Sequence, residues 1–147
     1  MSQRIDVRSL VPEAYEGFLA VERFLHASEL PSSTLHLVKL RASQINGCAY
    51  CVRLHSGDMK KEGESDERIW GVAAWREATV FTPAERAALA VTEEATRLAD
   101  RALVSDEVWD EAARHYTDKQ LATLVVAIAM INSWNRILVT TRATPHA

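Results

Sequence analysis

Apolar residues recur at helical spacing along most of the chain, and the polar residues between them include the types that begin and end helices. In the first half, this pattern predicts a helix over 12–28 and a second helix that begins near Ser33. The pair Asn46-Gly47 ends the second helix and precedes a third, which runs to about Gly63. We find no segment with the strict alternation that is typical of a half-buried strand.

In the second half, polar positions predict where further helices begin. Serine, threonine or aspartate before an apolar run accepts hydrogen bonds from free N–H groups, and glutamate or glutamine three residues later completes a capping box. The expected starts are Ser65 or Asp66 for a helix through Phe81, Thr82 with Glu85, Ser105, and Thr117 with Gln120 for a helix from 118 to about 140. We therefore predict an all-α fold, a single domain over 1–147 that forms a helical bundle of about seven helices.

The last predicted helix is apolar on nearly all sides from Leu121 to Ile131. Such a helix lies at the centre of a bundle or in a subunit interface, so we expect a homo-oligomer. Its apolar run is too short to cross a bilayer, and the N-terminal residues lack the apolar core of a signal peptide. We therefore expect a cytoplasmic protein with no membrane partner.

Composition and charge narrow the class of function. Hydrophobic residues make up 48% of the 147 positions and charged residues 25%, an ordinary balance with enough apolar material for a core. The formal net charge is -3, and the lysines and arginines are dispersed along the chain. A nucleic-acid-binding protein would carry a basic stripe or patch, so we expect no nucleic-acid partner.

Both cysteines of the chain, Cys48 and Cys51, lie within one short segment, and His55 follows them. Residues three or four apart on a helix are neighbours, at about 5–6 Å between Cβ atoms, so the three side chains are expected to point the same way. Cys48 falls in the first turn of its predicted helix, where free N–H groups and the dipole favour thiolate over thiol. The segment thus offers two sulfurs that can bond and a base that can accept a proton.

Three interpretations of this cysteine pair compete. A structural zinc site needs four ligands, and the segment supplies three, although His26, His36, His115 or His146 could complete it. The cysteines could also be small core residues. Where thiols are kept reduced, a close cysteine pair is more often catalytic or metal-binding than a structural crosslink. We therefore favour a redox-active dithiol without a metal.

The segment LVKLRASQINGCAYCVRLHSGD resembles the core motif of the alkylhydroperoxidase D-like (AhpD-like) proteins of the carboxymuconolactone decarboxylase superfamily. The segments AAWREATVFTPAERAALAVTEEAT and LVVAIAMINSWNRI are also similar to its short, single-domain members, so the likeness covers about residues 30–140. The resemblance implies an all-helical fold that assembles into trimers or hexamers, and a thiol-dependent peroxidase. It places Cys48 and Cys51 on the redox pair and His55 on the proton-relay histidine.

One position departs from the family pattern. Better-known members carry a glutamate twelve residues before the first cysteine, as the acid of the relay, and here that position is His36. Histidine can pass protons near neutral pH, so His36 is a candidate for this role. Glu85 and Glu93 are alternatives, although Glu85 is explained first by its capping box and Glu93 first as a solvated helix position. Tyr50 is expected to point away from the sulfurs and to pack.

These observations predict a peroxidase that needs no metal, flavin or haem cofactor, with Cys48, Cys51, His55 and His36 as its catalytic residues. We expect Cys51 to attack the hydroperoxide, because His55 lies one turn away and can handle the proton, and because the resemblance makes the second cysteine the one that meets peroxide. By resemblance, the reductant is an external dithiol, a lipoyl group or a thioredoxin-like protein. The alternatives are a redox-sensing or interaction protein without turnover, and a lactone decarboxylase, whose chemistry does not use a cysteine pair.

Overall fold

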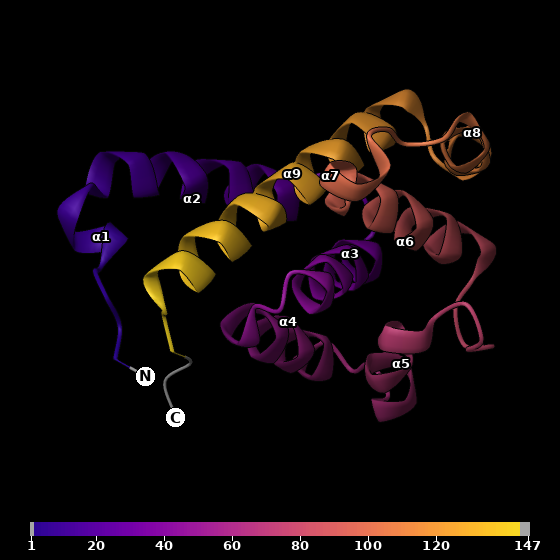
Figure 1. The fold of residues 1–147 in the computed structure, drawn as a ribbon. Helices are drawn as coiled ribbons and strands as arrows, with labels where there is room; N and C mark the ends of the chain where they lie inside the picture. The colour runs from indigo at the N-terminus through magenta and orange to yellow at the C-terminus, as the bar shows by residue number, and fades with distance from the viewer. Residues whose placement is uncertain (1, 145–147) are drawn as a thin grey trace.

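The computed structural model describes residues 2–144, which fold into helices joined by short connections, with no β-strand in that range (Figure 1). The elements are α1 (Val7–Leu10), α2 (Pro12–His26), α3 (Ser32–Ile45), α4 (Ala49–Lys61), α5 (Asp66–Gly71), the 3-10 turn η1 (Val72–Ala74), α6 (Pro83–Thr96), α7 (Leu98–Arg101), α8 (Asp106–His115) and α9 (Asp118–Thr141). The predicted all-α class is confirmed. The two α-helices beyond the expected seven are α1 and α7, each four residues long.

The capping boxes predicted at Thr82 and Thr117 are both present, with Glu85 and Gln120 as the reciprocal partners. The helix predicted through residue 81 is wrong beyond its first turns, because α5 ends at Gly71 and η1 follows. The guanidinium groups of Arg86 and Arg68 donate to four backbone carbonyls between residues 75 and 80. These carbonyls are satisfied without a helix, so the segment takes an irregular path.

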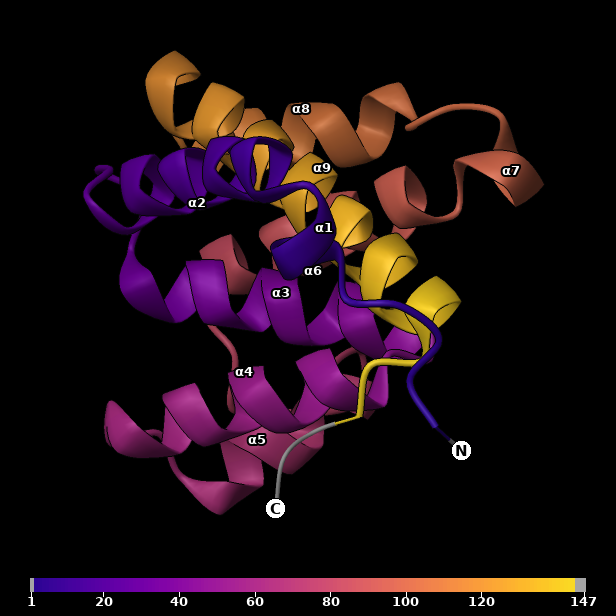
Figure 2. The same cartoon turned by 90° about the vertical axis from the view of Figure 1, so that its left-hand side faces the viewer.

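Helix α3 lies at the centre of the fold, where it packs against α4, α6 and α9. Figure 2 shows α2 above α3 and α4 below it. All seven residues from Thr34 to Leu40 are buried, which requires neighbours on every side of the helix.

The apolar α9 is less enclosed than its sequence suggested, because Val125 and Val126 are exposed in the single chain. By length and composition this helix could cross a membrane, but a long helix that packs within a folded domain passes the same test. Here α9 packs against α2, α3, α4, α6 and α8. The arrangement places the start of α4, which carries the cysteines, against α3 and the C-terminal half of α9 (Figure 1).

Candidate active site around Cys51 and His55

The turn between α3 and α4 holds Cys48 from both sides. Gly47 has a φ of 66°, a left-handed conformation that glycine adopts without strain. The N–H of Gly47 donates to Gln44 O at 3.3 Å and the N–H of Cys48 donates to Ser43 O at 3.0 Å, which completes a Schellman motif at the end of α3. The position of Cys48 is therefore set by the end of one helix and the beginning of the next.

Cys48 is the N-cap of α4 and precedes its first turn. Its Sγ accepts a hydrogen bond from the N–H of Cys51 at 3.3 Å, as a serine or threonine cap would. Hydrogen bonds from the Cys51 thiol and from backbone N–H groups outweigh burial and lower the pKa of Cys48 from 9.0 to about 7. The hydrogen bond to Cys48, together with burial, raises the pKa of Cys51. The pair therefore shares one proton near neutral pH, with the negative charge on Cys48.

Buried amide and hydroxyl groups lie behind the two sulfurs. Asn135 of α9 donates from Nδ2 to Ser43 Oγ at 3.1 Å and accepts from Asn46 Nδ2 at 2.9 Å. Hydrogen bonding by the Asn135 side chain contributes to lowering the pKa of Cys48. Sequence reasoning missed Asn135, and the available signal was a pair of asparagines three residues apart, Asn132 and Asn135, that follow the apolar run of the last helix.

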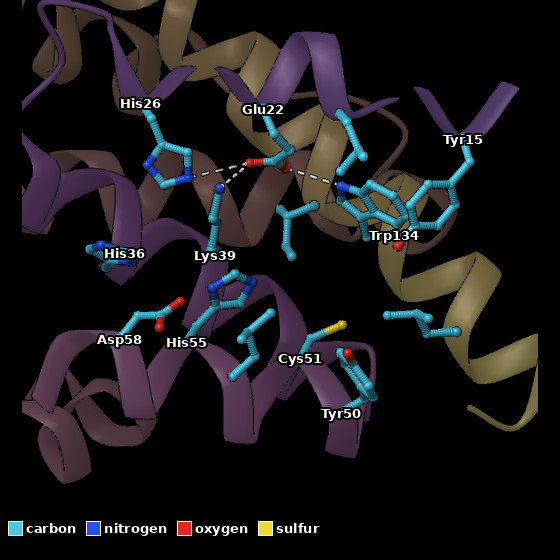
Figure 3. A pocket seen from close by; sticks show the side chains of 14 residues that line it. Tyr15, Glu22, His26, His36, Lys39, Tyr50, Cys51, His55, Asp58 and Trp134 are labelled. Atoms are coloured by element: carbon cyan, nitrogen blue, oxygen red, sulfur yellow. Dashed lines mark hydrogen bonds and ion pairs between the residues drawn. The ribbon is translucent and has the colours of Figure 1, made fainter. Parts of the chain in front are cut away.

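Cys51 and His55 face a cavity of about 250 Å³ between α2, α3, α4 and α9. Its walls are formed by Tyr15, Leu19, Glu22, His26, His36, Lys39, Tyr50, Cys51, Leu54, His55, Asp58, Ile131, Trp134 and Leu138. In Figure 3, α4 presents Cys51 and His55 from one side, and α2 presents Tyr15, Glu22 and His26 from the opposite side. Cys48 is outside this set of lining residues, so the cavity gives a small molecule access to Cys51.

His55 is only 8% exposed. Burial, followed by the positive charge of Lys39, lowers the pKa of His55 from 6.5 to about 3. Its imidazole is therefore neutral at physiological pH. Among residues 2–144, the Nδ1 atom of His55 is one of two buried side-chain nitrogen or oxygen atoms without a hydrogen-bond partner, and the other is Nδ1 of His36.

A buried ion pair forms the opposite wall of the cavity. The ammonium group of Lys39, a residue only 2% exposed, contacts the carboxylate of Glu22. Glu22 also accepts a hydrogen bond from Trp134 Nε1 at 3.0 Å and lies 3.8 Å from His26 Nε2. Sequence reasoning missed this group, because its members lie far apart in the chain and carry no motif.

The structure places His36 in the cavity wall, one layer above α4. Its Nε2 donates to Glu62 Oε1 at 2.9 Å, with Glu62 taken as ionised. Asp58, which sequence reasoning also missed, lies one turn beyond His55 on α4 and is partly buried. The signal for Asp58 was its spacing of three residues from His55.

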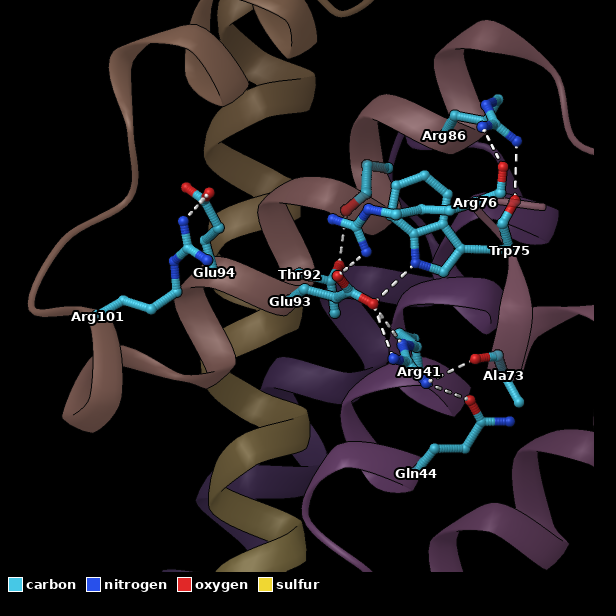
Figure 4. Close-up of polar contacts among 11 residues, drawn as sticks. Arg41, Gln44, Ala73, Trp75, Arg76, Arg86, Thr92, Glu93, Glu94 and Arg101 are labelled. Carbon is cyan, nitrogen blue, oxygen red and sulfur yellow. Dashed lines mark hydrogen bonds and ion pairs between the residues drawn. The ribbon is translucent and has the colours of Figure 1, made fainter.

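Glu85 and Glu93, the alternative relay acids, are held elsewhere. Glu85 caps α6 and accepts from Arg68 Nη2 at 2.7 Å. Glu93 is not a solvated position as predicted, because it is 7% exposed and accepts hydrogen bonds from Trp75, Arg41 and Arg76 (Figure 4). Neither glutamate is among the cavity-lining residues in the described part of the chain.

One further expectation needs correction. Tyr50 packs as expected, but it packs against the cysteines and lines the cavity beside Cys51 rather than pointing away, because Cys48 precedes α4 as its N-cap instead of lying within the helix. Within residues 2–144, the two cysteines and His55 do not form a three-ligand metal cluster. Of the other histidines considered, His115 pairs with Glu111 at 2.9 Å, and His146 lies outside the described residues.

The lowered pKa of Cys48 predicts a pH-dependent thiolate. Its ultraviolet absorbance should reach half its maximum near pH 7, and Cys51→Ala should move this midpoint upward, because the largest cause of the lowered pKa is removed. Because the pKa of Cys48 is lower in the folded protein than in the unfolded chain, its thiolate stabilises the fold. This contribution is complete at pH values above the unfolded pKa and is lost as the pH falls through about 7. A midpoint unchanged in Cys51→Ala would show that the Cys51 thiol does not hold the charge on Cys48.

Comparison with known proteins identifies the family. The model of the Carboxymuconolactone decarboxylase family matches residues 11–94. The uncharacterized protein YdfG of Bacillus subtilis (strain 168) is 38% identical over 137 residues, which cover 93% of this chain and 92% of YdfG.

Solved structures agree with this match. ATU0492 from Agrobacterium tumefaciens, a protein of unknown function provisionally described as the antioxidant defence protein AhpD, is 36% identical, with a TM-score of 0.95 over 99% of both chains. The debrominase Bmp8 shares the fold at 21% identity, with a TM-score of 0.82 over 92% of this chain and 73% of its own. Since the family match spans more than half of the sequence and the similarity to YdfG nearly all of it, the chain belongs to the carboxymuconolactone decarboxylase family, as an AhpD-like member.

Proposed function

We propose that this protein is a thiol peroxidase that reduces hydroperoxides by cycling Cys48 and Cys51 between dithiol and disulfide. The observation that supports this most is the position of Cys51, which lines a cavity with His55 while its backbone N–H donates to Cys48 Sγ behind it at 3.3 Å. A peroxide in the cavity would meet one sulfur, and the other would be within reach to close the disulfide.

The proposed cycle has two steps, the oxidation of Cys51 to a sulfenic acid and the closure of the disulfide. The Cys51 thiol passes its proton to the Cys48 thiolate, and the Cys51 thiolate attacks the terminal oxygen of the hydroperoxide. The O–O bond breaks, Cys51 becomes a sulfenic acid, and the leaving alkoxide receives a proton relayed by His55, while Cys48 gives up its proton and returns to the thiolate. The Cys48 thiolate then attacks the Cys51 sulfur and displaces hydroxide, which leaves as water after taking a proton from solvent. The peroxide gains two electrons, and the dithiol becomes a disulfide.

His55 serves this cycle as a neutral imidazole. Because its pKa is about 3, it does not store a proton at physiological pH. A neutral ring can still donate from one nitrogen while the other accepts, so it can orient the peroxide and relay a proton to the leaving oxygen. His36, joined to Glu62 at 2.9 Å, is the proposed next member of this relay toward the surface.

The cavity walls favour an organic hydroperoxide. Leu19, Leu54, Ile131, Trp134 and Leu138 supply apolar surface for a carbon tail. The disulfide must then be reduced by an external dithiol, for which we propose a lipoyl group or a thioredoxin-like protein. A cytoplasmic location would supply such reductants.

Steady turnover tests this function. The protein is expected to consume many equivalents of cumene hydroperoxide per chain when dihydrolipoamide or reduced thioredoxin is supplied, and to do so after exhaustive chelation. Cys51→Ser protein is the blank. A single equivalent consumed, however much dithiol is present, would indicate a redox sensor. Loss of turnover on chelation, with recovery on adding zinc, would make the reaction metal-dependent.

We propose further that the chain self-associates through the face formed by α7, α8 and α9. Leu98, Trp109 and Val125 are 50%, 39% and 45% exposed in the single chain, and they line a hollow of about 540 Å³. Monomeric proteins rarely expose apolar surface of this kind in one patch. Light scattering should give a native mass that is a multiple of 16.4 kDa, the trimer or hexamer being expected, and Val125→Asp should lower it. A wild-type monomer at micromolar concentration would contradict this assembly.

A further inference from the structure

Three cavity residues form a cluster that the peroxidase cycle does not explain in full. One ring nitrogen of His36, one of His55 and a carboxylate oxygen of Asp58 all lie within 4.8 Å of one another. His36 comes from α3, whereas His55 and Asp58 occupy successive turns of α4. Figure 3 shows the Asp58 carboxylate between the two imidazoles in this view.

Two buried nitrogen atoms in this cluster lack a partner. Within the described chain, Nδ1 of His36 and Nδ1 of His55 make no hydrogen bond, although the residues are only 3% and 8% exposed. Buried polar atoms nearly always have a partner, and those that do not point to an ion or a water molecule. Two such atoms, on residues that lie side by side in the cavity, indicate a place where a ligand binds.

Glu62 prepares His36 for metal coordination. Nε2 of His36 is engaged by Glu62 Oε1 at 2.9 Å, which places the ring proton on Nε2 and leaves the lone pair of Nδ1 free. Metal-binding histidines commonly donate their other ring nitrogen to a carboxylate in this way. Glu62 is therefore placed as an outer partner of the site rather than as a ligand.

The donor set selects the class of metal. Two imidazoles and one carboxylate suit zinc and related transition metals, whereas calcium and magnesium prefer oxygen ligands alone. With Zn–N and Zn–O distances of about 2.0–2.2 Å, tetrahedral ligands lie roughly 3.4 Å apart. The ligand atoms lie no more than 4.8 Å apart, so each pair needs to approach by at most about 1.4 Å, through side-chain rotation of the two histidines as well as of the partly buried Asp58. The fourth position is then open to water or substrate.

The surrounding charges are compatible with a cation. The positive charge of Lys39 would repel a cation, but the carboxylate of Glu22 pairs with this ammonium group and neutralises its charge. Asp58 and Glu62 add two negative charges, although Asp58 Oδ1 also lies 3.4 Å from the exposed ammonium of Lys61. A bound metal would replace that surface contact.

We propose that His36, His55 and Asp58 bind one divalent transition-metal ion of the zinc class, and that the bound ion stops peroxide reduction by taking His55 out of proton transfer. The second half of this proposal rests on the peroxidase function. The site differs from the set of two cysteines and His55 considered from the sequence, because it uses no sulfur.

Metal binding can be measured without activity. We would titrate cobalt(II), with zinc as a competitor, into full-length protein carrying Cys48→Ser and Cys51→Ser, so that neither thiolate can bind metal. One equivalent should bind with the visible absorption of a low-symmetry four-coordinate site. His36→Ala and Asp58→Asn in this background should each weaken binding at least tenfold, and Glu62→Gln should weaken it by about 10-fold or more through its effect on His36.

His115→Ala is the matched control, since it removes a histidine that pairs with a carboxylate on the surface, and it should leave binding unchanged. Two results would overturn the site. One is the absence of saturable metal binding, and the other is metal affinity in His36→Ala and Asp58→Asn equal to that of the protein with only the two cysteines replaced. Asp58 is partly exposed, so Asp58→Asn remains informative if His36→Ala does not fold.

In the otherwise wild-type protein, zinc should inhibit turnover, and Asp58→Asn should make inhibition at least tenfold less sensitive to zinc. Binding without inhibition would refute only the effect on the cycle.

Discussion

Cys48→Ser protein, treated with one equivalent of hydroperoxide, is expected to form a sulfenic acid at Cys51 that a dimedone-type reagent traps. Cys51→Ser protein should trap almost nothing, and its steady turnover should fall at least about a hundredfold, because the attacking sulfur is lost. Mass spectrometry of the labelled peptides and a hydroperoxide-consumption assay measure these two results.

Charge and access favour different sulfurs in this prediction. Cys48 has the lower pKa, about 7, so it carries the negative charge in the resting dithiol. Cys51 has a raised pKa, but it lines the cavity where a peroxide can bind. A proton shift between two hydrogen-bonded sulfurs is a small rearrangement, whereas a peroxide cannot react with a sulfur it does not reach. We therefore expect access to decide, with Cys51 as the attacker and Cys48 as the resolving sulfur.

His55→Ala tests the relay in the same assay. Loss of the imidazole should slow trapping at Cys51 at least about tenfold in Cys48→Ser protein, because proton transfer to the leaving oxygen loses its carrier. His115→Ala, a substitution of a surface histidine, is the control. If Cys48 is the sulfur that labels when Cys51 is replaced, the roles are reversed and thiol acidity was the better guide.

Glu93→Ala is expected to lower the free energy of unfolding by about 3 kcal/mol, because it leaves buried donors without their acceptor. Arg41, only 14% exposed in its side chain, approaches Glu93 Oε1 at 2.8 Å, and Trp75 Nε1 donates to the same oxygen at 2.9 Å (Figure 4). Arg76 contacts the other carboxylate oxygen. Urea unfolding followed by tryptophan fluorescence measures the change.

The effect of Glu93 should depend on pH with a definite sign. Burial would raise the pKa of Glu93, but hydrogen bonds from Arg76, Trp75 and Arg41 outweigh it and hold the pKa below its usual range. A carboxyl group with a lowered folded pKa stabilises the protein above its unfolded pKa and loses this effect as the pH falls through the folded one. The difference in the free energy of unfolding between the wild type and Glu93→Ala should therefore become smaller at acidic pH.

Glu111→Ala provides the control for this experiment. Glu111 also contacts an arginine and another nitrogen donor, but on the surface, where ion pairs contribute little. The substitution Glu111→Ala should therefore leave the free energy of unfolding nearly unchanged. Equal losses in Glu93→Ala and Glu111→Ala would mean that burial of the Glu93 network does not contribute to folding.

The sequence by itself determined the helical class, the family and most helix starts. Thr82 with Glu85 and Thr117 with Gln120 form capping boxes as predicted, because each box uses hydrogen bonds between residues three apart. The close spacing of Cys51 and His55 likewise places both in one wall of the cavity. These features are local, so a short segment carries all the information that they need.

Only the tertiary structure decided which polar groups are buried and what they contact. Lys39 resembles a surface lysine in the sequence, but α3 is enclosed on every side, and Glu22 from α2 neutralises its charge. Asn135 reaches Ser43 across 92 positions of sequence, and Trp134 reaches Glu22 across 112. A polar side chain can be buried only where a distant segment supplies its partner, and that pairing depends on how the helices pack.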